Sequence, residues 1–217
     1  MAGVFFGCIV TNMINVTEQT IVTCAKAILD NACSSGDVLV CNELQSYSLD
    51  TTVVSIGSKL CTVNASVWHA ADAMYHQIDI SSFSTVTGYA TGGAVALALA
   101  VIAAERYGTC LTVCSFSTPP VGDRMFAQVA ACIRHLRVRL ADDVIPTQGW
   151  TLKHNCVAIL IGEFHCTCLD IYQSRFWTEY IGSPTSHLMP LYMTRVMLSI
   201  SEHMTGASQE CWVSVDI

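Results

Sequence analysis

The stretch that decides the fold reads Val86-Thr87-Gly88-Tyr89-Ala90-Thr91-Gly92-Gly93-Ala94. β-Branched residues open it, and an apolar run rich in glycine and alanine follows over residues 90–104. That run is shorter than the ~18–20 apolar residues that a membrane span needs, so it predicts a buried helix. The glycines at the junction predict a tight turn with close backbone packing. The stretch therefore predicts a strand that turns directly into a long helix.

Strands and helices are predicted to alternate on both sides of this junction. Strands are expected at 38–40, 53–56, 60–63, within 78–87, at 111–116 and at 136–140. Helices are expected at 15–33, 68–75, 94–107, 123–135 and 191–202, with Gly108 closing the third. Two runs around Gly162, 155–161 and 163–169, indicate a hairpin. Such alternation is typical of βαβ units, so the predicted fold class is α/β, with a mostly parallel central sheet flanked by helices.

Length and composition limit the class of protein. The 217 residues predict a single domain over 1–217, and 52% hydrophobic against 12% charged residues exclude a disordered chain. The mean hydropathy of +0.47 leaves apolar surface available for an apolar partner. The net charge is −7, without a cluster of lysines and arginines, which argues against nucleic acid as a partner.

Twelve cysteines bear on the cellular compartment. The chain is longer and more apolar than a disulfide-rich secreted scaffold, and the segment 1–10 lacks the basic region of a signal peptide. We therefore expect reduced cysteines and a cytoplasmic location, with a secreted chain as the alternative. Alternate residues of a strand face opposite sides, so His165 would point away from Cys166 and Cys168. We expect no metal, because a structural zinc site needs four ligands, and no cofactor.

The glycine spacing at the junction is that of a nucleophile elbow. In a G-x-S-x-G elbow, a serine stands on a strained turn between a strand and a helix and projects above the sheet. Here the frame is Gly88-x-Ala90-x-Gly92, with alanine in place of the serine. Taken alone, this pattern also fits a tight strand–helix turn without chemistry, because small residues are abundant in this chain.

Further motifs make the chain similar to the class 3 lipases, the family of the fungal triacylglycerol lipases. The family's elbow T-G-H-S-L-G-G-A-L-A corresponds to 87–96, its F-G-x-P-R-V-G-[ND] segment to 116–123, and its D-x-V-P-like turn to 143–146. An H-L-x-Y-like context corresponds to 186–192, and the V-x-F-R-G-[ST] strand end is matched to 54–58. The resemblance covers roughly residues 53–192 and implies an α/β-hydrolase-like fold. Two departures are the missing nucleophile and a helix before the elbow that is expected to be short.

The resemblance also implies the site residues. Position 90 is the nucleophile position, Asp143 the acid and His187 the base, in the chain order of α/β-hydrolases. Asp143 is preferred to Asp142 because it aligns with the family's aspartate, and His154, the rival base, is expected to be structural. The oxyanion donors are expected to be the backbone N–H of Thr91 and the backbone and hydroxyl of Ser58.

Ala90 leaves three explanations open: an engineered Ser→Ala change, a natural non-catalytic relative, or a chance resemblance. The matching acid and base favour the first. The expected function is a serine ester hydrolase, of the lipase, esterase or phospholipase type, acting on an acyl lipid or apolar ester and inactivated by Ala90. The alternative is a natural lipase-like scaffold that binds lipid or protein. Transient contact with a membrane surface fits either reading.

Overall fold

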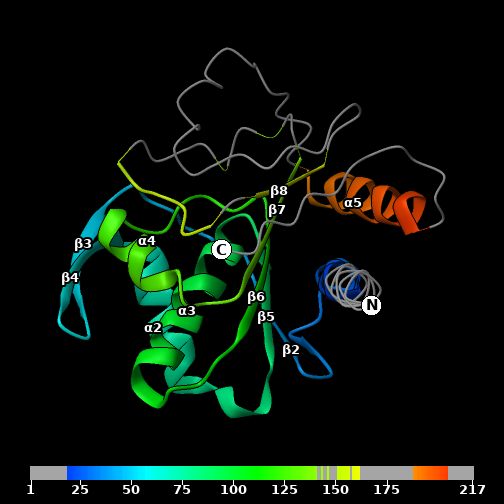
Figure 1. Cartoon of the computed structure of the whole chain (residues 1–217). Helices are drawn as coiled ribbons and strands as arrows, with labels where there is room; N and C mark the ends of the chain where they lie inside the picture. Colours follow the sequence, from blue (N-terminus) through cyan, green and yellow to red (C-terminus); the bar gives the residue numbers. More distant parts are fainter. Residues whose placement is uncertain are drawn as a thin grey trace, which may run out of the picture.

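The computed structural model describes residues 19–140, 143, 146, 151–156, 158–161 and 188–204. A six-stranded sheet has the order β1-β2-β5-β6-β7-β8, and every neighbouring pair from β2 to β8 is parallel (Figure 1). Its strands are β1 (Ser34–Ser35), β2 (Val38–Cys41), β5 (Thr85–Tyr89), β6 (Thr112–Phe116), β7 (His135–Leu140) and β8 (Ala158–Ile161). The predicted α/β class and mostly parallel sheet are confirmed.

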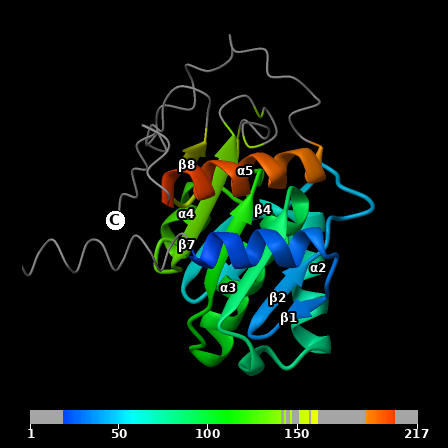
Figure 2. The same cartoon turned by 90° about the vertical axis from the view of Figure 1, so that its right-hand side faces the viewer.

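Helices cover both faces of this sheet. The helices α2 (Ala65–Gln77), α3 (Thr91–Tyr107) and α4 (Arg124–Ala130) lie on one face, with the short 3-10 helix η1 (Ile80–Ser82) before β5. A helix over residues 19–29 and α5 (Met189–Met204) cover the other face, where they lie side by side (Figure 2). Each face has its own apolar cluster, since the strands alternate their side chains between the two layers.

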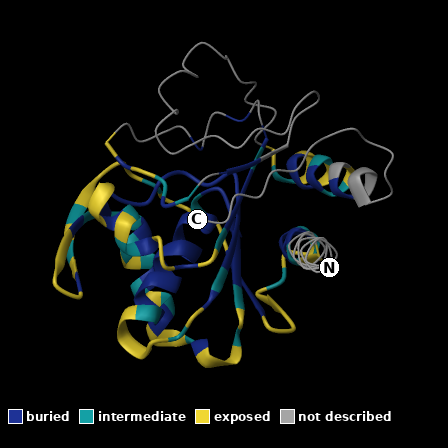
Figure 3. Cartoon of the chain, viewed as in Figure 1, coloured by how far each residue is buried: buried dark blue, intermediate teal, exposed yellow. Residues whose placement is uncertain are grey.

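The helix α3 is the centre of the larger layer. Every residue from Gly92 to Ala103 is buried, and this shows as an unbroken dark-blue segment in Figure 3. A helix that is apolar all round has to be buried on all sides, and here α2, β5 and β6 surround it. Gly108 ends it in the left-handed conformation, with φ of 66°, as the sequence predicts.

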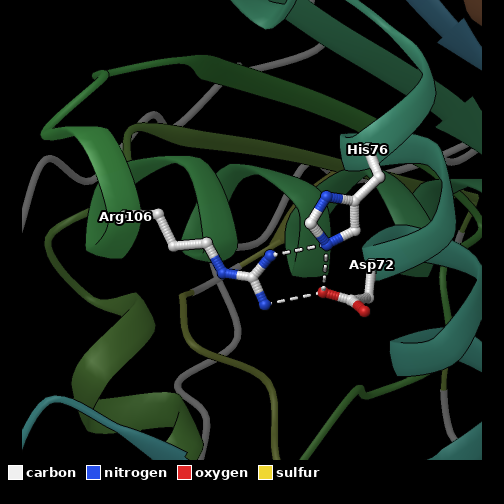
Figure 4. Close-up of polar contacts among 3 residues, drawn as sticks. All are labelled: Asp72, His76 and Arg106. Atoms are coloured by element: carbon white, nitrogen blue, oxygen red, sulfur yellow. Dashed lines mark hydrogen bonds and ion pairs between the residues drawn. The ribbon is translucent and has the colours of Figure 1, made fainter.

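A polar cluster joins α2 to α3 at the far end from the elbow (Figure 4). Arg106 donates a hydrogen bond of 2.7 Å to the carboxylate of Asp72, and its second nitrogen lies 3.2 Å from Nε2 of His76. The guanidinium also lies 4.9 Å from the centre of the Tyr75 ring. These groups are partly exposed, so the cluster orients the two helices and adds little free energy of unfolding.

Three predicted elements differ from the structure. The helix expected at 68–75 is longer than predicted: α2 has 13 residues, because the side chain of Asn64 accepts a hydrogen bond from Val67 N–H and caps the helix early. The helix expected at 123–135 ends at Ala130, where a turn leads into β7. The first run of the expected hairpin contains β8, which pairs in parallel with β7, and the run 163–169 lies outside the described residues.

The runs at 53–56 and 60–63 form a separate two-stranded sheet. The strands β3 (Thr51–Ile56) and β4 (Lys59–Asn64) pair in antiparallel register, with Ile56 opposite Lys59. A two-residue turn at Gly57 and Ser58 connects them, and Gly57 has φ of 56°, which suits such a hairpin turn. The hairpin packs beside α4 and α2 and does not extend the main sheet.

Candidate active site

Ala90 occupies the junction between β5 and α3 in a strained conformation. Its φ of 49° and ψ of −123° lie in a region that residues with a Cβ rarely adopt. Its N–H donates a hydrogen bond of 2.9 Å to the carbonyl of Phe116, and its own carbonyl accepts one of 3.1 Å from Gly93 N–H. Because such strain requires surrounding structure to hold it, the junction has the backbone of the nucleophile elbow that the sequence predicts.

The glycines around Ala90 make this turn possible. A Cβ added to Gly88 would lie 2.6 Å from the backbone nitrogen of Gly93, so strand and helix could not approach as they do. A Cβ added to Gly92 would collide with the carbonyl oxygen of Cys41 and lie 2.9 Å from the carbonyl carbon of Asn42. The G-x-A-x-G spacing is therefore a steric requirement of this junction, and β2 lies directly against it.

Asp143 is buried beyond the end of β7, with 1% of its surface exposed. The hydroxyl of Ser117 donates a short hydrogen bond to its carboxylate, and Arg139 donates one of 3.0 Å to its backbone carbonyl. Ser117 follows β6 and has φ of 54°, and its N–H bonds to Val138 of β7. A buried carboxylate needs such partners, since burying an unpaired charge costs on the order of several kcal/mol.

Two tyrosines link Asp143 to the elbow. The rings of Tyr89, which precedes Ala90, and Tyr192 of α5 meet edge to face at 5.3 Å. The Tyr192 hydroxyl donates to the Val138 carbonyl and accepts from Leu140 N–H, each at 3.1 Å. Burial, and then the negative charge of Asp143, raise the pKa of both phenols well above the ordinary value. The structure therefore brings Asp143 and the elbow into one electrostatic environment, with both phenols neutral.

Thr91 lies where the sequence predicts it, as the first residue of α3 after position 90. Its hydroxyl accepts a hydrogen bond of 2.9 Å from Leu44 N–H. Leu44 belongs to the loop that follows β2, the strand beside β5 in the sheet. In α/β-hydrolases, the second oxyanion donor comes from the loop after the strand next to the nucleophile strand. In this chain that loop is Asn42–Leu44.

The structure does not bring Ser58 to the elbow, and its assignment as an oxyanion donor is corrected. The N–H of the neighbouring Gly57 donates a hydrogen bond of 3.1 Å to Glu105 near the C-terminal end of α3. At 1.5 Å per residue, Glu105 lies about 22 Å along the helix from Ala90. The strand end at 53–58 resembles the family motif in sequence, but it is a hairpin turn at the opposite end of the helix.

Of the two histidines considered as the base, the structure describes one. His187 and Asp142 lie outside the described residues, whereas His154 does not. Its Nε2 lies 2.7 Å from the carbonyl oxygen of Pro146, and because a carbonyl only accepts, Nε2 carries the proton. Burial, and then the positive charge of Arg137, lower the pKa of His154 well below its ordinary value. His154 is thus a neutral imidazole held in a structural hydrogen bond.

Ser117 and the loop Asn42–Leu44 have no clear signal in the sequence. Ser117 partners Asp143 through its side chain, but in sequence it is one small residue among several after β6. The loop Asn42–Leu44 contains no serine or threonine, so nothing marks it as an oxyanion loop. Among the residues that the structure describes, no three histidine, cysteine or acidic side chains are placed to hold a metal ion. The segment His165–Cys168 lies outside them.

Comparison with known proteins agrees with this fold. Residues 46–150 match the model of the family Lipase (class 3). Among solved structures, the chain is similar to lipase II from Rhizopus niveus, with 18% identity, a TM-score of 0.52, and coverage of 66% of this chain and 63% of that one. It is also similar to a triacylglycerol lipase from Penicillium expansum, with 12% identity, a TM-score of 0.50, and coverage of 69% of each chain.

The chain matches only part of the length of these related proteins. The match covers only 46% of the lipase from Rhizopus microsporus var. chinensis, so this chain spans about half the length of that relative. No curated protein matches the chain. At such identities the solved structures show the fold, which is α/β-hydrolase-like. The family model covers residues 46–150, just under half of the chain, so this segment is similar to the class 3 lipases.

Proposed function

We propose that the protein is a serine ester hydrolase of the lipase or esterase type whose nucleophile is replaced by Ala90. The observation that carries the proposal is the strained elbow at Ala90 together with the buried carboxylate of Asp143, whose charge acts on the neighbouring Tyr89. A methyl group cannot attack an acyl carbon, so the chain with Ala90 forms no acyl-enzyme. The proposed substrate class is an acyl lipid or apolar ester, as the similarity of residues 46–150 to the class 3 lipases suggests.

In this proposal a serine at position 90 attacks the acyl carbon and His187 takes its proton. Asp143 holds the imidazole in the tautomer and orientation that this transfer needs. The support for His187 comes from its sequence neighbour: Leu188 directly precedes α5, and its carbonyl accepts a hydrogen bond from Tyr192 N–H. Tyr192 itself contacts Tyr89 at the elbow. The start of α5 is therefore tied to the strand that carries position 90.

The oxyanion of the tetrahedral intermediate is assigned two backbone donors. One is the N–H of Thr91, at the positive end of α3. The other comes from the loop Asn42–Leu44, whose contact with Thr91 supports this role. Removal of one such donor typically costs about 10²–10³ in rate.

The proposal is tested by restoring the nucleophile. Ala90→Ser should hydrolyse short- and medium-chain p-nitrophenyl esters, whereas the Ala90 protein should not. In the Ala90→Ser background, His187→Ala and Asp143→Asn should each lower kcat by orders of magnitude, and the two losses should be far from additive because triad members act together. His154→Ala serves as the matched control and should lower the Tm more than kcat. Absence of turnover in a folded Ala90→Ser protein contradicts the proposal.

The alanine itself supports a second candidate, a natural non-catalytic relative that binds lipid or protein on the same fold. This candidate requires an alanine codon at position 90 in the source gene. A serine codon there eliminates it. The codon therefore separates an engineered change from a natural one without any assay.

The proposal also includes transient contact of the protein with a membrane surface and a cytoplasmic location. Leu188 and Leu191 at the start of α5 are 57% and 47% exposed, and they support transient contact with a membrane surface. No helix among the described residues is long and apolar enough to cross a membrane. The eight cysteines of the described part are free, which supports a reducing compartment. Cosedimentation with phosphatidylcholine vesicles, lost in a Leu188→Ser, Leu191→Ser double variant, tests the membrane contact.

A further inference from the structure

Cys156 lies between β7 and β8 and contacts the first residue of β7. Its Sγ lies 3.6 Å from the backbone carbonyl oxygen of His135. The ring of His135 is fixed on two sides: Nε2 lies 2.7 Å from the hydroxyl of Ser115, and Nδ1 lies 2.8 Å from the side-chain oxygen of Asn155. The thiol is neither exposed nor fully buried, so it combines a fixed polar environment with partial access to solvent.

A buried guanidinium reaches the same thiol. Arg137 follows His135 on β7, and only 6% of its surface is exposed. Its guanidinium donates a hydrogen bond to the sulfur of Cys156. Its Nε–H is also enclosed, but it has no hydrogen-bond partner among the residues that the structure describes. Because a buried donor without a partner is costly, this N–H is a site for an acceptor atom next to the sulfur.

The basic side chains change the acidity of Cys156. Burial raises the pKa of its thiol, but the charges of His135 and then Arg137, with a hydrogen bond from each, outweigh burial and hold the pKa below the ordinary value. Burial lowers the pKa of Arg137 to about 10, and Cys156 is the largest influence in the opposite direction. At Cys41, by contrast, burial alone raises the pKa to about 12. Since the thiolate is the nucleophile, Cys156 has the environment of a reactive cysteine and Cys41 that of an inert one.

We propose that Cys156 is a redox-modification site, at which hydrogen peroxide oxidises the thiol to a sulfenate that Arg137 holds. The sulfur attacks one oxygen of the peroxide with an electron pair, so that an S–O bond forms while the O–O bond breaks. The sulfur is oxidised by two electrons, and the departing hydroxide takes up the proton of the thiol and leaves as water. The new oxygen accepts a hydrogen bond from the Nε–H of Arg137. This chemistry does not depend on the proposed ester hydrolase.

The first test follows alkylation of the folded protein by iodoacetamide at pH 6 and pH 8, resolved by residue with mass spectrometry. An ordinary thiol, such as the exposed Cys132, should react roughly 75-fold more slowly at pH 6 than at pH 8. For Cys156 this ratio should be at least about threefold smaller, and because each residue is compared with itself, burial does not bias the result. Arg137→Met should move the Cys156 ratio toward that of Cys132. Arg134→Met removes the same charge from an exposed position and should leave the ratio unchanged.

Three results of this experiment overturn the proposal. They are equal ratios for Cys156 and Cys132 in the parent protein, no alkylation of Cys156 at either pH, and a ratio that a folded Arg137→Met protein leaves unchanged. If Arg137→Met does not fold, the comparison of cysteines within the parent protein still decides.

Capture of the sulfenate with dimedone is the second test, after one equivalent of hydrogen peroxide at pH 7. Label on Cys156 should exceed that on Cys110 and Cys132 at least about threefold, although those two are more exposed. Arg137→Lys keeps the charge but removes the Nε–H, so delayed addition of dimedone should find a sulfenate that lives at least about threefold less long. Labelling that follows exposure, or an equally long-lived sulfenate in Arg137→Lys, overturns the proposal.

Discussion

Replacing Ala90 by glycine measures the strain at the elbow. A residue with a Cβ held at φ of 49° and ψ of −123° carries about 1–3 kcal/mol of strain, which glycine does not. Against this gain stand the loss of one buried methyl group, about 0.8 kcal/mol, and the greater backbone freedom of unfolded glycine, about 0.5–1 kcal/mol. The terms nearly cancel, so Ala90→Gly should leave the free energy of unfolding almost unchanged.

The matched control is Ala98→Gly in the middle of α3. Ala98 is also fully buried, but its backbone is helical, so the substitution loses the methyl group and the helix propensity without relief of strain. It should cost about 2 kcal/mol. The two variants should therefore differ by about 1–3 kcal/mol in urea unfolding, and by about 2–4 °C in Tm for each kcal/mol.

Equal destabilisation by both substitutions would refute this reasoning. It would mean that Ala90 relaxes at no cost, so that the junction is an ordinary turn.

Three further outcomes are expected. Gly92→Ala should cost about 3 kcal/mol or more in urea unfolding, because its Cβ meets the rigid backbone of Cys41, whereas Gly36→Asn, with open space around Gly36, should cost less than about 1 kcal/mol. Tyr192→Phe should lower the free energy of unfolding by about 1–3 kcal/mol, because Leu140 N–H and the Val138 carbonyl lose a buried partner. Below about pH 6.5 the unfolded chain protonates His154 and the folded chain does not, so the free energy of unfolding should decrease as the pH is lowered. His154→Gln should reduce this pH dependence by up to about 1.4 kcal/mol per pH unit.

The sequence predicts the elbow well because its determinants are local. The glycine spacing, the apolar run of α3 and the stop at Gly108 are all contained in one continuous segment. The nearby Asp143 follows from a motif only a few residues after β7. These parts need no knowledge of which strands pair, so a linear reading is sufficient for them.

The position of the loop Asn42–Leu44 depends instead on which strand lies beside β5. The run at 53–56 is apolar enough to resemble a strand of the main sheet, and Ser58 after Gly57 resembles its catalytic end. Only the register shows that this run pairs with β4 and that Val38–Cys41 pairs with β5. Pairing between residues so far apart in sequence leaves no local trace, so the sequence alone points to Ser58 and gives no sign of the loop Asn42–Leu44.

The strained turn at Ala90 and the buried Asp143 depend differently on which residue stands at position 90. The strain at Ala90 is imposed by Gly88 and Gly92, whose contacts with the backbone leave no other path, so it persists whatever side chain stands at position 90. Asp143 has no such constraint: a buried carboxylate is costly, and a neutral residue there would relieve the need for Ser117 as a partner. In the proposed function a base that Asp143 orients would account for this cost, and therefore the proposed pair of Asp143 and His187, more than the strained turn, would distinguish an interrupted hydrolase from a scaffold that never needed the chemistry.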